Sequence, residues 1–269
     1  MKPLFLAATL ALLALTDKGA AHEFWIDPEA YTINPGEVLL ADLRVGQEFV
    51  GSAMSYLPRR YETFVVVNGG ETREVEGRIG DIPALNMEGL EDGLAVVVHQ
   101  TGVSDLTWSE WERFLNFANH KDLGDVTAMH EARGLSQENV REDYIRYAKS
   151  LVAVGDGAGQ DTRFGMRTEL VALTNPYAED FETGEMAMEL WYDDALQPDY
   201  QVELFAMDAD GNVEITLHRT DTEGVVYLPV EPGMTYMADA VFLEAVEPEA
   251  EGDAIWVTHW ANMTFAMPE

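Results

Sequence analysis

The hydrophobic positions of the chain follow three successive patterns. In the first, short apolar runs at residues 38–45, 63–67 and 94–99 are separated by turns rich in Gly, Asp and Pro. Runs of this length with no helix between them are typical of antiparallel β-strands. We therefore predict a β-sandwich over residues 22–104.

The second pattern begins at Thr107 and has the period of an amphipathic helix. Apolar side chains recur at helical spacing in a first segment: Trp108, Trp111, Leu115 and Ala118. A shorter segment follows Gly124, and Ser136 is placed to cap a third. The apolar face of this third segment consists of Val140, Tyr144, Ala148 and Leu151. The pattern predicts an α-helical insert of three segments over residues 105–154.

The third pattern returns to short strand-like runs after a linker rich in Gly and Asp at residues 155–164. The runs lie at residues 169–173, 186–191, 201–207, 213–218, 225–228, 236–242 and 256–265. Their spacing predicts a second sandwich over residues 165–269, and the turn from Thr220 to Gly224 resembles those of CnaB-like domains. The expected fold class is mainly β, with two Ig-like or CnaB-like β-sandwich domains and the α-helical insert between them.

Residues 1–21 have the layout of a secretory signal peptide. Lys2 precedes an apolar run at residues 4–15, which is shorter than the about 20 residues needed to span a bilayer. The small residue Ala21 favours cleavage directly after it, which makes His22 the first residue of the mature chain. We expect a periplasmic protein with no segment inserted into the membrane.

The net charge of the chain limits which kinds of molecule it can bind. The chain has 49 Asp and Glu against 16 Lys and Arg, and a formal net charge of −33 at pH 7. Such a surface repels nucleic acid and anionic lipid and attracts cations. It is also a means of staying soluble in a salty habitat, and both explanations stay open at this point.

The motifs that mark common enzymes are absent from the sequence. There is no cysteine, no Gly-x-Ser-x-Gly, no His-Glu-x-x-His and no dinucleotide fingerprint. The glycine cluster at residues 155–161 lacks the Lys-Ser/Thr of a phosphate loop, and residues 208–212 lack the later glutamate of a calcium loop. We therefore predict no catalytic residue.

Histidine is the scarce residue type with useful chemistry, since the chain has only six. A mature chain that starts at His22 offers its α-amine and its ring Nδ1 to one metal ion, and both groups lose their protons near neutral pH. His99, His120 and His130 lie at the edge of the first domain and are the expected partner ligands. A nitrogen-rich site of this kind suits Ni(II), Cu(II) or Zn(II). The two remaining histidines fall in expected strands and are read as structural: His218 and His259.

Several motifs together resemble the DUF4198 family of exported bacterial proteins, which is grouped with NikM-like periplasmic components of nickel and cobalt uptake. The motifs are Ala21-His22-Glu23-Phe24-Trp25, Pro35-Gly36, the segment from Arg146 to Leu151 read as a helix and followed by Val154-Gly155-Asp156, Asn175-Pro176-Tyr177, His218-Arg219-Thr220-Asp221 with Gly224, and Trp260-Ala261-Asn262-Met263-Thr264-Phe265. The resemblance implies a β-rich periplasmic protein with a metal-linked role. Its histidine after the leader matches His22, and close members resemble this chain at His99, His120 and His130.

Three functions follow from these observations. The first is a periplasmic transition-metal-binding protein, an accessory to uptake or handling of nickel, cobalt or copper, which holds the ion with His22, His99, His120 and His130 and works with a membrane metal transporter. The second is a non-catalytic β-sandwich module that binds a protein or glycan. The third is a copper oxygenase, because a terminal histidine also resembles the copper brace of oxidative polysaccharide enzymes.

Overall fold

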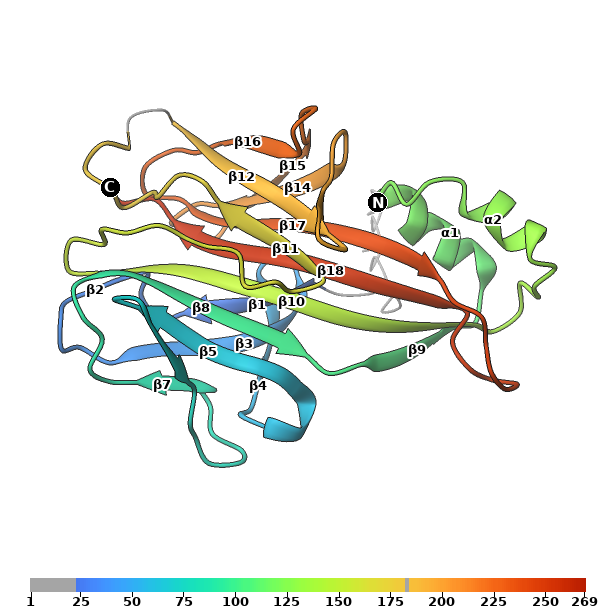
Figure 1. Cartoon of the computed structure of the whole chain (residues 1–269), viewed down its shortest axis with the longest axis horizontal. Coiled ribbons are helices and arrows are strands. Elements are labelled where there is room, and N and C mark those ends of the chain that lie inside the picture. The colour runs from blue at the N-terminus through green and yellow to red at the C-terminus, as the bar shows by residue number, and fades with distance from the viewer. Residues whose placement is uncertain (1–22, 182–183) are drawn as a thin grey trace, which may run out of the picture.

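The computed structural model describes residues 23–181 and 184–269, and its three β-sheets and two α-helices are shown in Figure 1. The predicted leader, its cleavage point after Ala21 and His22 lie outside the described residues. No helix in the part of the chain that the structure describes is long and apolar enough to cross a membrane.

A ten-stranded sheet forms the middle layer of the molecule. Its main path runs in the order β15 (Val213–Arg219), β14 (Gln201–Met207), β17 (Thr235–Ala245), β18 (Trp256–Ala266), β10 (Val140–Val154), β8 (Gly93–Thr101), β5 (Tyr61–Asn68) and β6 (Glu71–Glu74). Two further strands pair with β10: β2 (Thr32–Ile33) and β9 (Ser104–Trp108). Strands β10 and β18 pair in parallel at the centre of this sheet. Strands from both halves of the sequence are therefore hydrogen-bonded in one sheet.

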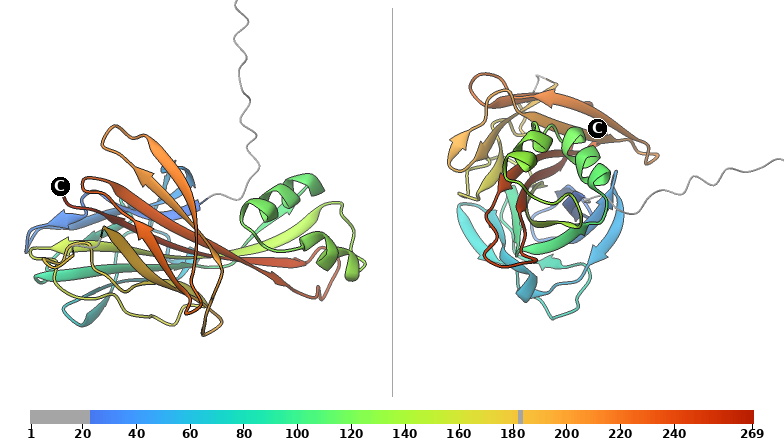
Figure 2. Two further views of the ribbon diagram at one scale, coloured as in Figure 1. Left: turned by 90° about the horizontal axis from the view of Figure 1, so that it is seen from above. Right: turned by 90° about the vertical axis from the view of Figure 1, so that its right-hand side faces the viewer.

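The third predicted helix is wrong, because residues 140–154 form the long strand β10 instead. At about 3.3 Å per residue this strand is about 50 Å long and follows the length of the molecule (Figure 2). Its second half, residues 146–154, is buried without interruption because layers cover both faces of the sheet. Burial on both faces removes the alternation of apolar and polar residues that would have distinguished this strand from a helix.

Two smaller sheets cover opposite faces of the middle layer. One contains β1 (Glu23–Pro28), β3 (Leu39–Gln47), β4 (Val50–Met54) and β7 (Leu85–Met87), and packs through residues such as Ile26, Leu39 and Leu43 on Val97 and Val152. The other contains β11 (Thr168–Ala172), β12 (Glu185–Tyr192), β13 (Ala195–Leu196) and β16 (Val225–Pro229). The second sheet packs through Met186, Met188 and Leu190 on Ala240 and Met263. The predicted mainly β fold with sandwich packing is confirmed.

The insert consists of helices α1 (Trp111–His120) and α2 (Val126–Ala132), which cover one end of the middle sheet (Figures 1 and 2). Phe117 of α1 stacks on Trp260 of β18 with ring centroids 5.6 Å apart. The Asp125 side chain caps α2 by accepting a hydrogen bond from the N–H of Ala128. A 3-10 turn, η1 (Pro58–Arg60), lies between β4 and β5.

The first strand, β1, was not predicted from the sequence, and it joins two layers. Phe24 and Ile26 point into the core under β3, whereas Trp25 points the other way and packs on Phe205 and Met237. A Cβ atom at Gly51 of the neighbouring β4 would lie 2.8 Å from the Trp25 ring, so only glycine leaves room there.

The substitution Trp25→Ala tests whether this packing of β1 between two layers stabilises the fold. Trp25 is fully buried, so we expect a loss of about 3–5 kcal/mol in the free energy of unfolding. The measurement is urea unfolding of the mature chain, with Val50→Ala as the control because Val50 is 80% exposed. Equal stability of the two variants would contradict the packing role of Trp25.

Candidate functional site

A row of polar side chains crosses the face of the middle sheet beneath the start of the described chain. Glu203 on β14 pairs in register with Asp239 on β17, which pairs with Asn262 on β18. Each of these three residues is at most 3% exposed. Burying polar side chains on core strands costs folding free energy unless they form hydrogen bonds or ion pairs.

The main partner is Lys121, which follows α1 directly and has a buried side chain. Its Nζ lies 2.7 Å from Glu203 Oε2, 3.0 Å from Asp239 Oδ2 and 3.8 Å from Glu23 Oε1. We refer to Glu23, Lys121, Glu203 and Asp239 as the Lys121 cluster. It connects the first strand, the end of helix α1 and two strands of the C-terminal half.

Burial and mutual attraction set the protonation of the Lys121 cluster. Burial raises the pKa of Glu23 to about 7, against the opposing attraction of Lys121. Burial likewise raises the pKa of Asp239. Burial acts to lower the pKa of Lys121, but its three carboxylate neighbours outweigh burial and raise it, so Lys121 stays charged. One cation thus faces three carboxylates, one of which titrates near neutral pH.

His120 borders the Lys121 cluster on its outer side. Its Nε2 lies 3.0 Å from Glu203 Oε1, while its side chain is 61% exposed to solvent. Contact with the Glu203 carboxylate raises the pKa of His120. Burial acts to raise the pKa of Glu203, but His120 and Lys121 outweigh burial and lower it. An imidazole and a carboxylate are therefore presented together at the edge of a buried polar site.

Three buried oxygen atoms at this site have no hydrogen-bond partner with good geometry among the described residues. They are Glu23 Oε2, Asn262 Oδ1 and Glu203 Oε1, and the last of these lies 3.0 Å from His120 Nε2 in an ion pair. Most buried acceptors in folded proteins are paired, so each of these atoms calls for a donor or a cation. Glu23 is also the residue that directly follows His22 in the chain.

His99 lies on the opposite side of β1 from the Lys121 cluster. Its ring is 5.0 Å from the ring of Phe24, 5.4 Å from that of Tyr61 and 5.0 Å from that of Phe64, measured between centroids. Burial lowers the pKa of His99 to about 3. His99 is thus a neutral imidazole inside an aromatic cage.

His130 lies further along the insert, and neighbouring groups engage both of its ring nitrogens. Its Nε2 is 3.0 Å from the carbonyl oxygen of Ser136, and its Nδ1 accepts a hydrogen bond of 3.4 Å from Trp256 Nε1. The ring also packs on Trp111, with centroids 4.4 Å apart. This environment fixes His130 as a neutral member of an aromatic core.

The two histidines read as structural lie in strands. His259 is buried on β18, with its Nδ1 3.2 Å from the Tyr147 hydroxyl and its Nε2 3.2 Å from Glu244. His218 on β15 lies 2.8 Å from the Thr216 hydroxyl.

The structure therefore does not bring the predicted ligands His99, His120 and His130 together. Within residues 23–181 and 184–269, no group of three or more His, Asp or Glu side chains is arranged to hold a metal ion. Of these three histidines, His120 is the one that borders the Lys121 cluster, where its ring contacts the Glu203 carboxylate. His99 and His130 sit in separate apolar environments, where a charged metal ion would be poorly solvated.

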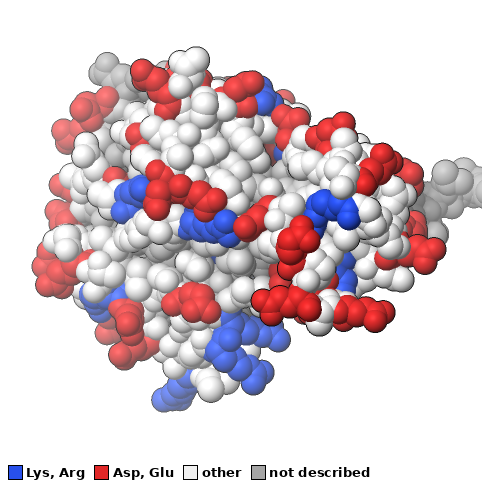
Figure 3. Space-filling model, turned by 45° about the vertical axis from the view of Figure 1, so that its right-hand side comes forward, with Lys and Arg blue, Asp and Glu red and all other residues white. Residues whose placement is uncertain are grey.

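The Lys121 cluster was not predicted from the sequence, although the sequence contains a signal for it. Glu203 and Asp239 are single acidic residues inside otherwise apolar runs, Val202-Glu203-Leu204 and Ala238-Asp239-Ala240. In a chain with 49 Asp and Glu, a single acidic residue is not by itself a sign of a functional site. Their position in the middle of buried strands is what sets them apart from surface carboxylates, which Figure 3 shows spread over one face of the molecule.

Comparison with known proteins gives the family. The family model described as "Domain of unknown function (DUF4198)" matches residues 19–244. The chain belongs to the DUF4198 family. No curated protein matches this DUF4198 chain.

One similar solved structure is the crystal structure of a tetra-tandem repeat in the extending region of a large adhesion protein. It is 13% identical, with a TM-score of 0.21, and the match covers 91% of the DUF4198 chain but only 49% of the adhesion chain. The DUF4198 chain thus spans about half the length of that structure.

The substitution Lys121→Met tests the Lys121 cluster of this DUF4198 protein. Removing the ammonium leaves buried carboxylates uncompensated, and we expect a loss of about 3–5 kcal/mol in the free energy of unfolding near neutral pH. Glu23 has a folded pKa raised to about 7, so it is protonated at pH 5 and charged at pH 8. The loss should therefore be larger at pH 8 than at pH 5.

The matched control for Lys121→Met is Arg141→Met, which removes a cation from an exposed pair with Asp105. That variant should lose at most about 1 kcal/mol. Chemical unfolding at both pH values measures both. A loss for Lys121→Met that is as small as the control, or that grows toward acid pH, would contradict the electrostatic role of Lys121.

Proposed function

We propose that this protein is exported to the periplasm and binds one divalent transition-metal ion at the start of its mature chain. The ligands would be the α-amine and ring of His22 with the imidazole of His120. The observation that carries the proposal is the burial of Glu23 in the Lys121 cluster, which His120 borders. Consecutive Cα atoms are about 3.8 Å apart, so anchoring Glu23 also limits where residue 22 can lie.

The donor atoms near Glu23 support a metal rather than an organic cation. His120 supplies an imidazole, and Glu203 Oε1 lies 3.0 Å from it. Nitrogen donors with an adjacent carboxylate suit Ni(II), Co(II) and Cu(II). A carboxylate that contacts a ligand imidazole also orients the ring and raises its basicity, as outer-shell carboxylates do in many metal sites.

Lys121 supports the same proposal by neutralising the inner part of the site. Its ammonium contacts Glu203 Oε2 and Asp239 Oδ2, which leaves Glu203 Oε1 directed toward His120. A metal ion at the outer edge would therefore meet His120 and the remaining oxygen of Glu203. The unpaired Glu23 Oε2 offers a further acceptor to whatever group precedes it.

The biological role that fits this site is an accessory to nickel, cobalt or copper uptake or handling, with a membrane metal transporter as its partner. The resemblance to NikM-like proteins supports this role. The net charge of −33 supports it as well, because an acidic surface raises the local concentration of cations. We propose binding rather than catalysis, since two of the candidate histidines, His99 and His130, pack inside aromatic cores.

Isothermal titration of the mature protein tests the proposal. A chain that begins at His22 should bind Ni(II) or Cu(II) with a stoichiometry of one. Adding one glycine before His22 should weaken binding by about 100-fold or more, because it removes the terminal amine from the chelate. His120→Ala should weaken it by about tenfold or more, since even outer-shell changes cost about 10–100-fold.

The control variant is His218→Ala, which removes an imidazole from β15 without touching the Lys121 cluster. It should leave the affinity unchanged. Equal affinity of the glycine-extended chain would refute coordination by the terminal amine. Failure of the correctly processed chain to bind any of these metals would refute the proposed function and favour the non-catalytic β-sandwich module.

A further inference from the structure

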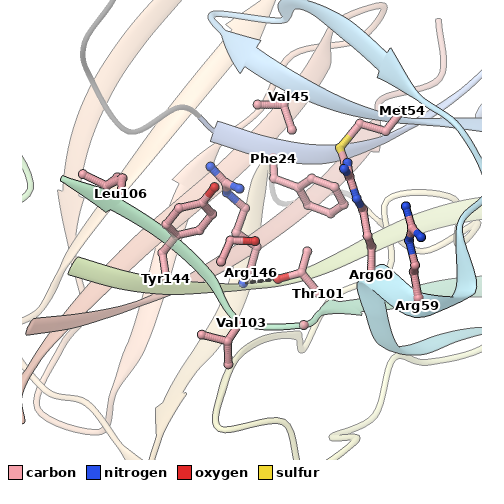
Figure 4. Close-up of a pocket in the computed structure, with 12 residues that line it drawn as sticks. Phe24, Val45, Met54, Arg59, Arg60, Thr101, Val103, Leu106, Tyr144 and Arg146 are labelled. Carbon is pink, nitrogen blue, oxygen red and sulfur yellow. Dashed lines mark hydrogen bonds between the residues drawn. The ribbon is translucent and has the colours of Figure 1, made fainter. Parts of the chain in front are cut away.

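A cavity of about 520 Å³ opens beside the first strand, on the side of the sheet that carries the Lys121 cluster (Figure 4). In this view Tyr144 and Arg146 rise from β10 on one side, Arg59 and Arg60 come from the η1 turn on the other, and Phe24 lies between them. The volume is within the range of small-molecule sites, which is about 300–1,000 Å³.

The charge of this cavity is opposite to that of the protein. Its lining includes three arginines, Arg59, Arg60 and Arg146, and no aspartate or glutamate. The whole chain has only 16 Lys and Arg against 49 Asp and Glu. Three basic side chains around one cavity therefore create a local positive site on a strongly negative molecule.

Arg59 and Arg60 are exposed, and neither forms an ion pair with any residue that the structure describes. Most other arginines of this chain are paired with a carboxylate, as Arg167 is with Asp193 and Glu244. The side chains of Arg59 and Arg60 are available to an external anion.

Arg146 forms the inner part of the cavity and is held in place. Its backbone N–H donates a 3.0 Å hydrogen bond to Thr101 Oγ1, and its guanidinium lies over the Tyr144 ring at 4.4 Å from the centroid. Only 8% of Arg146 is exposed. A guanidinium fixed by stacking presents its fork of N–H groups with little further loss of entropy.

Most of the remaining wall is apolar or aromatic, and Thr101 and Ser104 add two hydroxyl groups. Phe24 and Tyr144 contribute rings, and Val45, Met54 and Leu106 contribute aliphatic surface. A compact inorganic ion would leave this surface without contacts. A ligand that uses the whole cavity needs an anionic end for the arginines and an apolar body for the walls.

We propose that this cavity binds a small organic carboxylate with an apolar or aromatic body. Guanidinium groups match carboxylates in two-point hydrogen bonds, and Arg59, Arg60 and Arg146 surround the place where such a group would lie. The site is distinct from the Lys121 cluster, because neither His120 nor any of the four residues of that cluster lines it. It is linked to the Lys121 cluster through Phe24, which follows Glu23 in β1, and through the electrostatic attraction of Asp239 for Arg146.

Isothermal titration of the metal-free mature protein with phthalate, an aromatic dicarboxylate, tests this inference. We expect one phthalate per chain, with an affinity that falls as salt increases. The double variant Arg59→Gln, Arg60→Gln should weaken binding at least about tenfold, since it removes two charge-assisted contacts. Both residues are exposed, so this variant should fold normally, and its circular dichroism spectrum checks that.

The matched control is the double variant Arg78→Gln, Arg141→Gln, which removes the same charge from outside the cavity and should change affinity less than about twofold. His120→Ala should also leave phthalate binding unchanged, which separates this inference from the proposed metal function. Equal weakening by the control pair would show that only net charge matters and would overturn the inference. So would a lack of phthalate binding, tighter binding of inorganic phosphate, or equal binding of the neutral analogue phthalamide.

Discussion

The ammonium group of Lys121 is the interaction on which this arrangement depends. It is buried between Glu203 and Asp239 of the middle sheet and lies 3.8 Å from Glu23 of the first strand. A buried ion group of this kind adds little net stability compared with apolar residues of the same shape, but it is costly to break. It also has few acceptable geometries, so it fixes how the insert and the first strand sit on the sheet. The same interaction thus anchors Glu23, the first described residue of the chain.

The charge states within the Lys121 cluster favour binding of a further cation. At neutral pH Lys121 is charged, Glu203 is ionised, and Glu23 is near its midpoint because burial raises its pKa to about 7. A metal ion or a free α-amine beside Glu23 would favour its ionised form. Binding of a cation there would therefore release a fraction of a proton from Glu23.

The sequence predicted most of the strands, including β8 and β11, which are buried on both faces, but it missed two others that are covered on both faces. Strands β3 and β5 alternate between buried and partly exposed residues, and their positions were predicted correctly. Strand β10 is covered on both faces, so its apolar residues also fit a helical period, and it was predicted as a helix. The six residues of β1 show no alternation either, because Phe24 and Trp25 enter two different cores.

The candidate site was only partly predictable for a related reason. The sequence identifies histidines but not their surroundings, and the surroundings decide whether an imidazole can hold a metal. His99 and His130 are neutral members of aromatic cores, and His120 alone borders a carboxylate next to the first strand. The Lys121 cluster and the arginine-lined cavity both depend on residues that are far apart in the sequence. No local pattern reports such contacts.

The central claim is that the mature chain begins at His22, directly before the anchored Glu23. Intact mass spectrometry of the protein, exported with its own leader, tests this claim most directly. We expect one species with the mass of residues 22–269. A chain that retains any residue before His22, or that begins after it, would contradict the account because no terminal histidine amine would then exist beside the Lys121 cluster.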